Sequence, residues 1–416
     1  MYKHFGISEN VINKVCNAEK EVSDIFLAID RICEENQLKV LKAFIDSKVS
    51  ESHFVESTGY GYNDIGRDKI EEVYSKVFNT EAALVRQQIV SGTHAISLAL
   101  FALTRPGDNI LSINGLPYDT LSATLGLNNE PSSLKEYNIS FDNVDLINNN
   151  FDIDGIGKKI NANTKLIMIQ RSRGYSERKP ISVNQIKEVI SYVKSIRKDI
   201  IVLVDNCYGE FVNTIEPTDV GADIICGSLI KNPGGGLAKS GGYIAGKQDL
   251  IEKCSYRLTA PGIGNEVGVN FNQNRNILQG LYMAPIAVAN ALKIVTLYSY
   301  VLNGYNIDTI PMYNESLDDI VIAIKLGDEE KLTKFCNIIQ NTSPVDSYLK
   351  PMSNDMPGYD SKVIMAAGCF VSGASIELSC DAPIREPFMA FMQGGLSYYQ
   401  GKLALMKAIE ELKLCK

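Results

Sequence analysis

The feature that most limits the fold of this chain is an apolar run ending in an acid, Ile201-Val202-Leu203-Val204-Asp205. Such a run is typical of a parallel strand buried on both faces, whose carboxyl end opens into a ligand crevice. A second apolar run, at 222–226, is followed by Gly227, Ser228 and Lys231, just before the glycines at 234–236. We therefore expect Asp205 and Lys231 at neighbouring strand ends.

An acid and a lysine placed in this way suit pyridoxal phosphate. This cofactor needs a lysine amine for its Schiff base and a carboxylate beside its pyridine nitrogen, which keeps the ring protonated as an electron sink. Asp205 could instead be a solvated loop acid or a helix cap, and Lys239 competes with Lys231. Lys231 is favoured because it lies at the strand end that precedes the glycines, where we expect the backbone to approach the cofactor closely.

The surrounding pattern predicts an α/β fold with a mostly parallel sheet of the seven-stranded type, covered by helices on both faces. Strands are expected at 82–87, 109–113, 166–169, 201–204 and 222–226, with helices at 91–103 and 183–196 between them. We expect a helical N-terminal arm at 1–57, a large cofactor-binding domain at 58–303 and a small C-terminal α+β domain at 304–416. The large domain should end in a helical region, 262–302, interrupted at Pro285. The small domain should contain strands at 319–324, 362–367 and 375–378 and helices at 329–339 and 401–414.

Composition narrows the class of ligand. The 416 residues carry a formal net charge of −8, which argues against a nucleic-acid or anionic-membrane partner and favours a small molecule. The sequence has three histidines and nine scattered cysteines without a Cys-x-x-Cys pair, which argues against a metal cluster. No secretion segment is recognisable, and no stretch approaches the ~20 uncharged apolar residues of a membrane span, so we expect a cytoplasmic protein.

Several side chains are candidates for holding the cofactor. Ser91, Gly92, Thr93 and His94 follow a strand and open a helix, where N–H groups and a hydroxyl could bind a phosphate, although a plain helix cap explains the same residues. Ser228 could reach that phosphate. Tyr118, just past a strand end, could stack on the ring, with His94 as its competitor.

Two arginines are candidates for binding a substrate carboxylate. Arg173 follows the strand at 166–169, and Arg385 lies in the small domain. Arginine forms bidentate pairs with carboxylates, but solvent-exposed charge is the alternative for both. A dinucleotide-binding turn is the runner-up for the glycine cluster, yet a strand-like segment follows these glycines where that motif requires a helix.

Six short motifs in order resemble the methionine γ-lyase-like, aluminium-resistance-associated branch of the Cys/Met-metabolism enzymes, which are fold type I pyridoxal-phosphate enzymes. They are TGYGY (58–62), SGTHA (91–95), QRSRGY (170–175), VDNCYG (204–209), GSLIKNPGG (227–235) and PIREP (383–387). The resemblance implies a Schiff base on Lys231, a ring-nitrogen partner in Asp205 and a stacking ring in Tyr118. It also implies that Gly92, Thr93 and Ser228 hold the phosphate.

The resemblance further implies a homodimer or homotetramer, in which the loop bearing Tyr60 and Tyr62 reaches the neighbouring subunit's phosphate. This sequence lacks the arginine of the usual Tyr-x-Arg there, and Ile230 replaces the small hydroxyl residue that usually precedes the lysine. Arg67 is a candidate to complete the phosphate site.

The expected function is β- or γ-elimination from a sulfur-containing amino acid such as cystathionine or methionine. The alternatives are transamination, aldol cleavage, γ-replacement and non-catalytic binding of the cofactor. These reactions share the chemistry of the cofactor ring, and only the substrate pocket determines which of them occurs.

Overall fold

A seven-stranded sheet forms the larger part of the molecule. The structure, a computed structural model, describes residues 1–356 and 361–414. The sheet has the order β1-β7-β6-β5-β4-β2-β3, and all its pairs are parallel except those made by β7. Its strands are β1 (Ala82–Arg86), β2 (Asn109–Ser112), β3 (Ser140–Asn143), β4 (Thr164–Gln170), β5 (Ile201–Asp205), β6 (Ile224–Ser228) and β7 (Gly242–Gly246). The expected mostly parallel sheet is confirmed.

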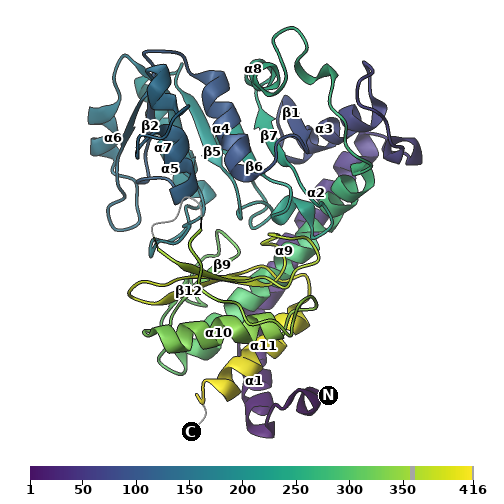
Figure 1. Cartoon of the computed structure of the whole chain (residues 1–416), viewed down its shortest axis with the longest axis vertical. Coiled ribbons are helices and arrows are strands. Elements are labelled where there is room, and N and C mark those ends of the chain that lie inside the picture. Colours follow the sequence, from purple (N-terminus) through teal and green to yellow (C-terminus); the bar gives the residue numbers. More distant parts are fainter. Residues whose placement is uncertain (357–360, 415–416) are drawn as a thin grey trace.

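Helices cover both faces of this sheet (Figure 1). They are α3 (Ile65–Val77), α4 (Gly92–Leu103), α5 (Asp119–Leu125), α6 (Ile153–Lys159), α7 (Val183–Ile196) and α8 (Gln248–Leu258). The central strand β5 is buried along its whole length between β4 and β6. The register pairs Gln170 with Asp205 and Asp205 with Cys226, so the carboxyl ends of three neighbouring strands meet at one edge.

The smaller part is an antiparallel sheet of order β10-β11-β12-β9-β8, packed against α10 (Glu329–Asn341) and α11 (Tyr398–Glu411). Its strands are β8 (Thr309–Ile310), β9 (Val321–Lys325), β10 (Val363–Ala366), β11 (Ser379–Pro383) and β12 (Met389–Gln393). The strand expected at 375–378 is wrong, because those residues are buried without pairing and the ladder begins at Ser379. Strand β12 was not expected.

The long helix α9 (Asn274–Asn303) joins the two parts and runs beside α2 (Ser23–Asp46) (Figure 1). The interruption expected at Pro285 is wrong, because the helix continues through it. Packing of most of the helix in the two cores outweighs the loss of one backbone donor at proline. By length and composition α9 could cross a membrane, contrary to expectation, but 72% of its apolar window is buried within the protein. It is therefore a core helix.

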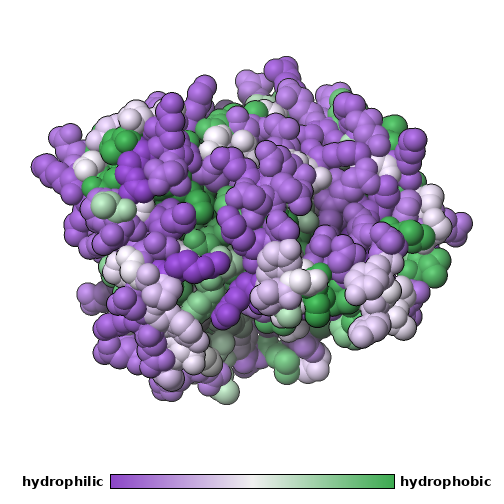
Figure 2. All heavy atoms as spheres, turned by 90° about the horizontal axis from the view of Figure 1, so that it is seen from above, coloured by the Kyte–Doolittle hydropathy of each residue, from purple (hydrophilic) through white to green (hydrophobic). Residues whose placement is uncertain are grey.

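The two N-terminal helices pack on different parts of the molecule. α1 (Glu9–Glu21) contributes Val11 and Val15 to the core of the smaller part, whereas α2 contributes Val40 to the core of the larger one. The expected boundaries at 57 and 303 remain a prediction. One face of the larger part is mostly hydrophilic, with small groups of hydrophobic side chains between the polar ones (Figure 2).

Candidate active site

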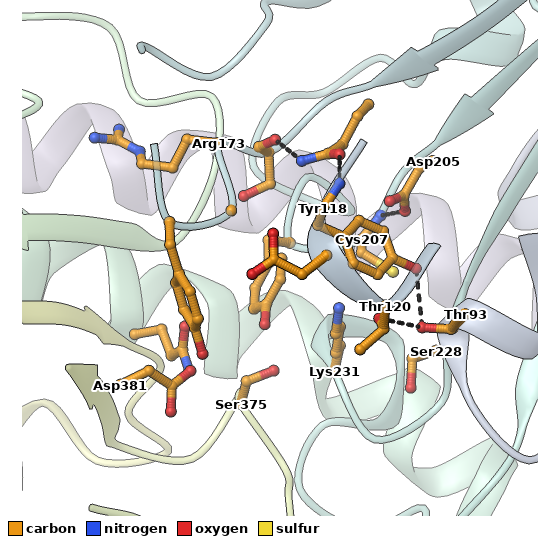
Figure 3. A pocket seen from close by; sticks show the side chains of 18 of the residues that line it. Thr93, Tyr118, Thr120, Arg173, Asp205, Cys207, Ser228, Lys231, Ser375 and Asp381 are labelled. Atoms are coloured by element: carbon orange, nitrogen blue, oxygen red, sulfur yellow. Dashed lines mark hydrogen bonds between the residues drawn. The ribbon is translucent and has the colours of Figure 1, made fainter. Parts of the chain in front are cut away.

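A cavity of about 550 Å³ lies between the carboxyl edge of the large sheet and one face of the small sheet. Figure 3 shows Lys231 near its middle, Asp205, Thr93 and Ser228 toward one side, and Asp381 on the opposite side. Most residues predicted for the site line this cavity: Ser91, Gly92, Thr93, Tyr118, Arg173, Asp205, Ser228, Lys231 and Arg385. His94, Tyr60 and Tyr62 do not. Among the described residues, no group of three or more His, Cys, Asp or Glu could hold a metal ion.

Lys231 and Asp205 form the charged centre of the cavity. The Lys231 Nζ lies 4.0 Å from the centre of the Tyr208 ring, and the Asp205 Oδ1 accepts the Cys207 N–H at 3.1 Å. Burial raises the pKa of the Asp205 carboxyl, and the Lys231 ammonium opposes this. Burial lowers the pKa of Lys231, but the acidic groups around it, among them Cys207, Tyr208 and Asp205, raise it well above its ordinary value. Because burial also raises the pKa of the Cys207 thiol, that thiol is neutral and Asp205 is the partner charge of Lys231.

The N-terminus of α4 provides a phosphate-sized set of donors. The Ser91 hydroxyl accepts the His94 N–H at 3.0 Å and caps the helix, while the N–H groups of Gly92 and Thr93 lie in the first turn, where a helix offers them no carbonyl. A Cβ on Gly92 would lie 3.1 Å from the Cys207 Sγ and 3.4 Å from the Ser228 Cβ, so only glycine fits this wall without displacing a neighbour.

Tyr118 closes the same side of the cavity. Its hydroxyl lies 2.9 Å from that of Thr93, and its N–H donates to the Gln170 Oε1 at 3.1 Å. Burial, followed by the nearby Asp205 charge, raises the pKa of the phenol well above its ordinary value, so the hydroxyl is neutral. A lysine amine, a facing carboxylate, a neutral aromatic ring and a helix N-terminus together fit pyridoxal phosphate.

His94 has a different position from the one predicted. Its Nδ1 accepts the Val90 N–H at 3.1 Å, and burial lowers the pKa of its imidazole, which favours the neutral acceptor form. His94 therefore closes the turn before α4 outside the cavity, and the expectation that it contacts the cofactor is corrected. Tyr118 is therefore the remaining candidate for stacking on the cofactor ring.

Arg173 lines the cavity, and its Nε and Nη2 have no hydrogen-bond partner among the described residues, so its substrate role stays a prediction. Its guanidinium donates to the Ile310 carbonyl at 2.7 Å and places Nε 3.8 Å from the Asp319 Oδ2. The side chain is 2% exposed and its contacts lie in the small domain, so it joins the two parts of the molecule. Arg385 lies exposed at the cavity mouth, with Nη2 3.5 Å from the Tyr175 carbonyl.

Sequence reasoning missed Arg178, which lines the cavity and donates to the carbonyls of Gln170 (3.0 Å) and Lys179 (2.9 Å). Burial lowers the pKa of Arg178 to about 10, which leaves it charged at neutral pH. The sequence signal for Arg178 was that it is the third arginine within eight residues after strand β4.

The glycine cluster serves packing on a helix. A Cβ on Gly234 would lie 1.7 Å from the Leu229 carbonyl oxygen, and one on Gly235 would lie 2.3 Å from the carbonyl oxygen of Gly280 in α9. These glycines let the turn after Lys231 lie directly against α9. They are not in the cavity wall, so the close approach expected near the cofactor is instead an approach to the helix. Lys239 is exposed and outside the cavity.

The loop with the two tyrosines is fixed at Gly59. The Gly59 carbonyl accepts the Gly268 N–H at 2.7 Å and the Arg67 Nη1–H at 3.3 Å, and Arg67 is 1% exposed. The Arg67 guanidinium therefore supports this loop, and its contact with a phosphate stays a prediction. Tyr60 and Tyr62 are 81% and 73% exposed.

Comparison with known proteins gives one consistent result. The family model described as methionine gamma-lyase matches residues 11–413. An uncharacterised protein of Bacillus subtilis is 47% identical over 397 residues, which are 95% of this chain and 94% of that protein. A Clostridium acetobutylicum protein, provisionally named a cystathionine beta-lyase involved in aluminium resistance, is 47% identical with a TM-score of 0.95, over 99% of this chain and 97% of that one. A carbon-sulfur lyase involved in aluminium resistance from Clostridium novyi is 47% identical with a TM-score of 0.94, over the same shares.

More distant structures share the fold alone. A pyridoxal-5'-phosphate-dependent protein of Escherichia coli is 16% identical with a TM-score of 0.61, over 92% of this chain and 97% of that one. The large sheet and small domain described above are thus those of a fold type I enzyme.

Proposed function

This chain belongs to the methionine gamma-lyase family, a family of pyridoxal-phosphate-dependent lyases, and we propose that it eliminates a thiol from the β or γ carbon of a sulfur-containing amino acid. The observation that carries the proposal is the placement of Lys231 between Asp205 and the open, substrate-sized side of one cavity. The overall reaction converts the amino acid and water to a 2-oxo acid, ammonia and a thiol.

The cofactor, when bound, supplies an electron sink that stabilises negative charge at the substrate α carbon. Lys231 would hold the cofactor, and its Nζ, when free, would remove the substrate α-proton and return a proton to the departing sulfur as the carbon–sulfur bond breaks. The charge of Asp205 would keep the ring nitrogen protonated.

Other residues bind and orient. The N–H groups of Gly92 and Thr93, with the Ser228 hydroxyl, would hold the phosphate, and Tyr118 would stack on the ring and shield it from water. The α-carboxylate is bound by Arg385, with Arg178 as the second candidate, because both guanidinium groups line the cavity. Arg173 is a further candidate for this role, since it also lines the cavity and its Nη2 has no hydrogen-bond partner among the described residues.

The active enzyme is proposed to be a cytoplasmic homodimer or homotetramer with shared sites. The fixed loop with the exposed Tyr60 and Tyr62 supports this, because two large aromatic rings held in water by a rigid anchor are typical of an interface.

The test is incubation of the purified, cofactor-loaded protein with cystathionine, methionine and cysteine, with 2-oxo acid and thiol measured together. Equal amounts of both products from at least one substrate are expected. Absence of product from all three, in a protein that binds the cofactor, would overturn the proposed elimination. A 2-oxo acid formed without thiol would indicate transamination.

A further inference from the structure

The side of the cavity opposite Asp205 is made by the small sheet. Residues alternate along its strands: Cys380 and Ala382 of β11 enter the core of the small domain, whereas Ser379 and Asp381 face the cavity. On the neighbouring strands β10 and β12, Met365 and Gln393 face the same way. This wall is therefore one face of a sheet, and its acid is Asp381. The other acids lining the cavity, Asp119 and Asp205, come from the large domain.

Asp381 is half-buried and has hydrogen-bond donors but no close cation. Its Oδ2 accepts the Gln393 Nε2–H at 3.2 Å, and the Tyr175 hydroxyl also bonds its carboxylate. Within the described residues, no lysine or arginine nitrogen lies within 4.0 Å of it. Two donors leave free acceptor positions on a carboxylate. A half-buried acid without a paired cation is costly, so its position facing the cavity indicates a cation that arrives with the ligand.

The position of Asp381 identifies which substrate group this is. The substrate's α-amino group must take the place of the Lys231 amine, and its α-carboxylate is assigned to an arginine. Asp381 lies across Lys231 from the cofactor side (Figure 3), where the part of the substrate beyond sulfur must extend. An anion there repels a distal carboxylate that has no ammonium beside it and gives nothing to the methyl group of methionine, whereas it binds an ammonium group.

We propose that Asp381 is a specificity-determining residue that binds a distal ammonium group, so that the substrate is a thioether or disulfide amino acid with a second amino group. This inference rests on the proposed elimination and narrows its substrate class. Arg385 and Arg178, both at the cavity, can then bind the two carboxylates of such a substrate separately.

The experiment compares cystathionine with two analogues that each lack one amino group, S-(3-carboxypropyl)cysteine and S-(2-carboxyethyl)homocysteine. The first analogue lacks the distal ammonium of a substrate for β-elimination, and the second lacks the distal ammonium of a substrate for γ-elimination. The wild-type kcat/KM for cystathionine should exceed that for the reacting analogue by about 10- to 100-fold, the usual range for one charged hydrogen bond. Asp381→Asn should remove most of this preference while retaining activity on the analogue, and Asp381→Glu should keep part of it.

Tyr175→Phe is the matched control, because it removes a hydrogen bond to Asp381 and leaves the charge. If Asp381 only holds Tyr175, then Asp381→Asn and Tyr175→Phe will lower kcat/KM for all substrates alike, which overturns the inference. A wild-type enzyme with equal kcat/KM for cystathionine and its analogue also overturns it, even if the variants fail to fold. Absence of elimination from every substrate instead contradicts the proposed function.

Discussion

The hydroxyl oxygens of Thr93 and Tyr118 lie 2.9 Å apart and join the first turn of α4 to the start of α5. Tyr118→Phe keeps the ring and removes this bond, so we expect cofactor affinity to fall only a few-fold, the effect of about 1 kcal/mol. Tyr118→Ala also removes the stacking surface and should weaken affinity further. Titration with pyridoxal phosphate, followed by absorbance, measures both. Equal losses in the two variants would show that the ring itself contributes nothing.

Replacement of Lys231 should abolish the attachment of the cofactor. Lys231→Ala is expected to lack the absorbance band of lysine-bound cofactor and to lose about 100-fold or more in kcat, because it removes both the attachment point and the proton acceptor. Borohydride reduction and mass spectrometry locate the modified lysine in the wild type. Lys239→Ala, outside the cavity, is the control and should keep the band. A band that persists in Lys231→Ala would contradict the assignment.

Glu210 should make stability depend on pH. Burial raises the pKa of this carboxyl to about 8 from its ordinary value of 4.5, and the Tyr243 hydroxyl donates to its Oε1 at 2.7 Å. Between these two pH values the folded protein keeps a proton that the unfolded chain releases. Stability therefore falls as pH rises across this window, by up to about 1.4 kcal/mol per pH unit. Glu210→Gln should show a smaller difference in thermal midpoint between pH 5 and pH 8 than the wild type. An unchanged difference would assign the pH dependence to other groups.

Helix propensity and packing predict opposite effects for a substitution of Gly280, which contacts the glycine turn. In a helix, Gly→Ala ordinarily stabilises by up to about 1 kcal/mol. Here a Cβ on Gly280 would lie 2.3 Å from the Gly234 carbonyl oxygen, so we expect Gly280→Ala to destabilise by about 1 to 3 kcal/mol and to weaken cofactor binding by moving Lys231. Gly61→Ala, with no atom within 4 Å of its Cβ, is the control. Thermal unfolding of both variants decides between propensity and packing.

Shared active sites can be tested by subunit mixing. Lys231→Ala and the double variant Tyr60→Ala, Tyr62→Ala should each have low activity alone. If the loop completes a neighbouring site, hybrids contain one intact site, and random reassembly as dimers should restore about one quarter of the wild-type activity. Activity that stays at the sum of the separate variants would show that each site is complete within one chain.

The sequence predicted the elements whose signal is local. The buried run 201–204 and the short run before Lys231 became adjacent parallel strands, because a fully apolar β-branched run has few other places to lie. The order of six motifs identified the family, which the comparisons confirm. Continuous helix at Pro285 was not predictable from the local pattern, since only packing against α2 and the two cores maintains it.

The substrate side of the cavity was the part that local pattern failed to find. Asp381 belongs to a short strand whose alternation becomes clear only when Gln393 and Met392 of β12 are paired with it. Arg173 was assigned to the substrate because it follows a strand end, and it does line the cavity, but the direction of its guanidinium depends on Ile310 and Asp319, more than 130 residues later in the chain. Long-range partners of this kind decide where a long side chain points.

Each sheet contributes one wall of the cavity, and we propose that one wall binds the cofactor and the other selects the substrate. Lys231, Asp205 and the proposed phosphate-binding turn come from the larger part of the molecule, whereas Ser379, Asp381 and Gln393 come from the small sheet. We therefore expect substitutions on the small sheet to change which substrate is accepted without disturbing the cofactor. A lineage of such proteins, or an engineer, could exchange substrates by altering a few outward-facing positions of β11 and β12 while the catalytic half stays the same.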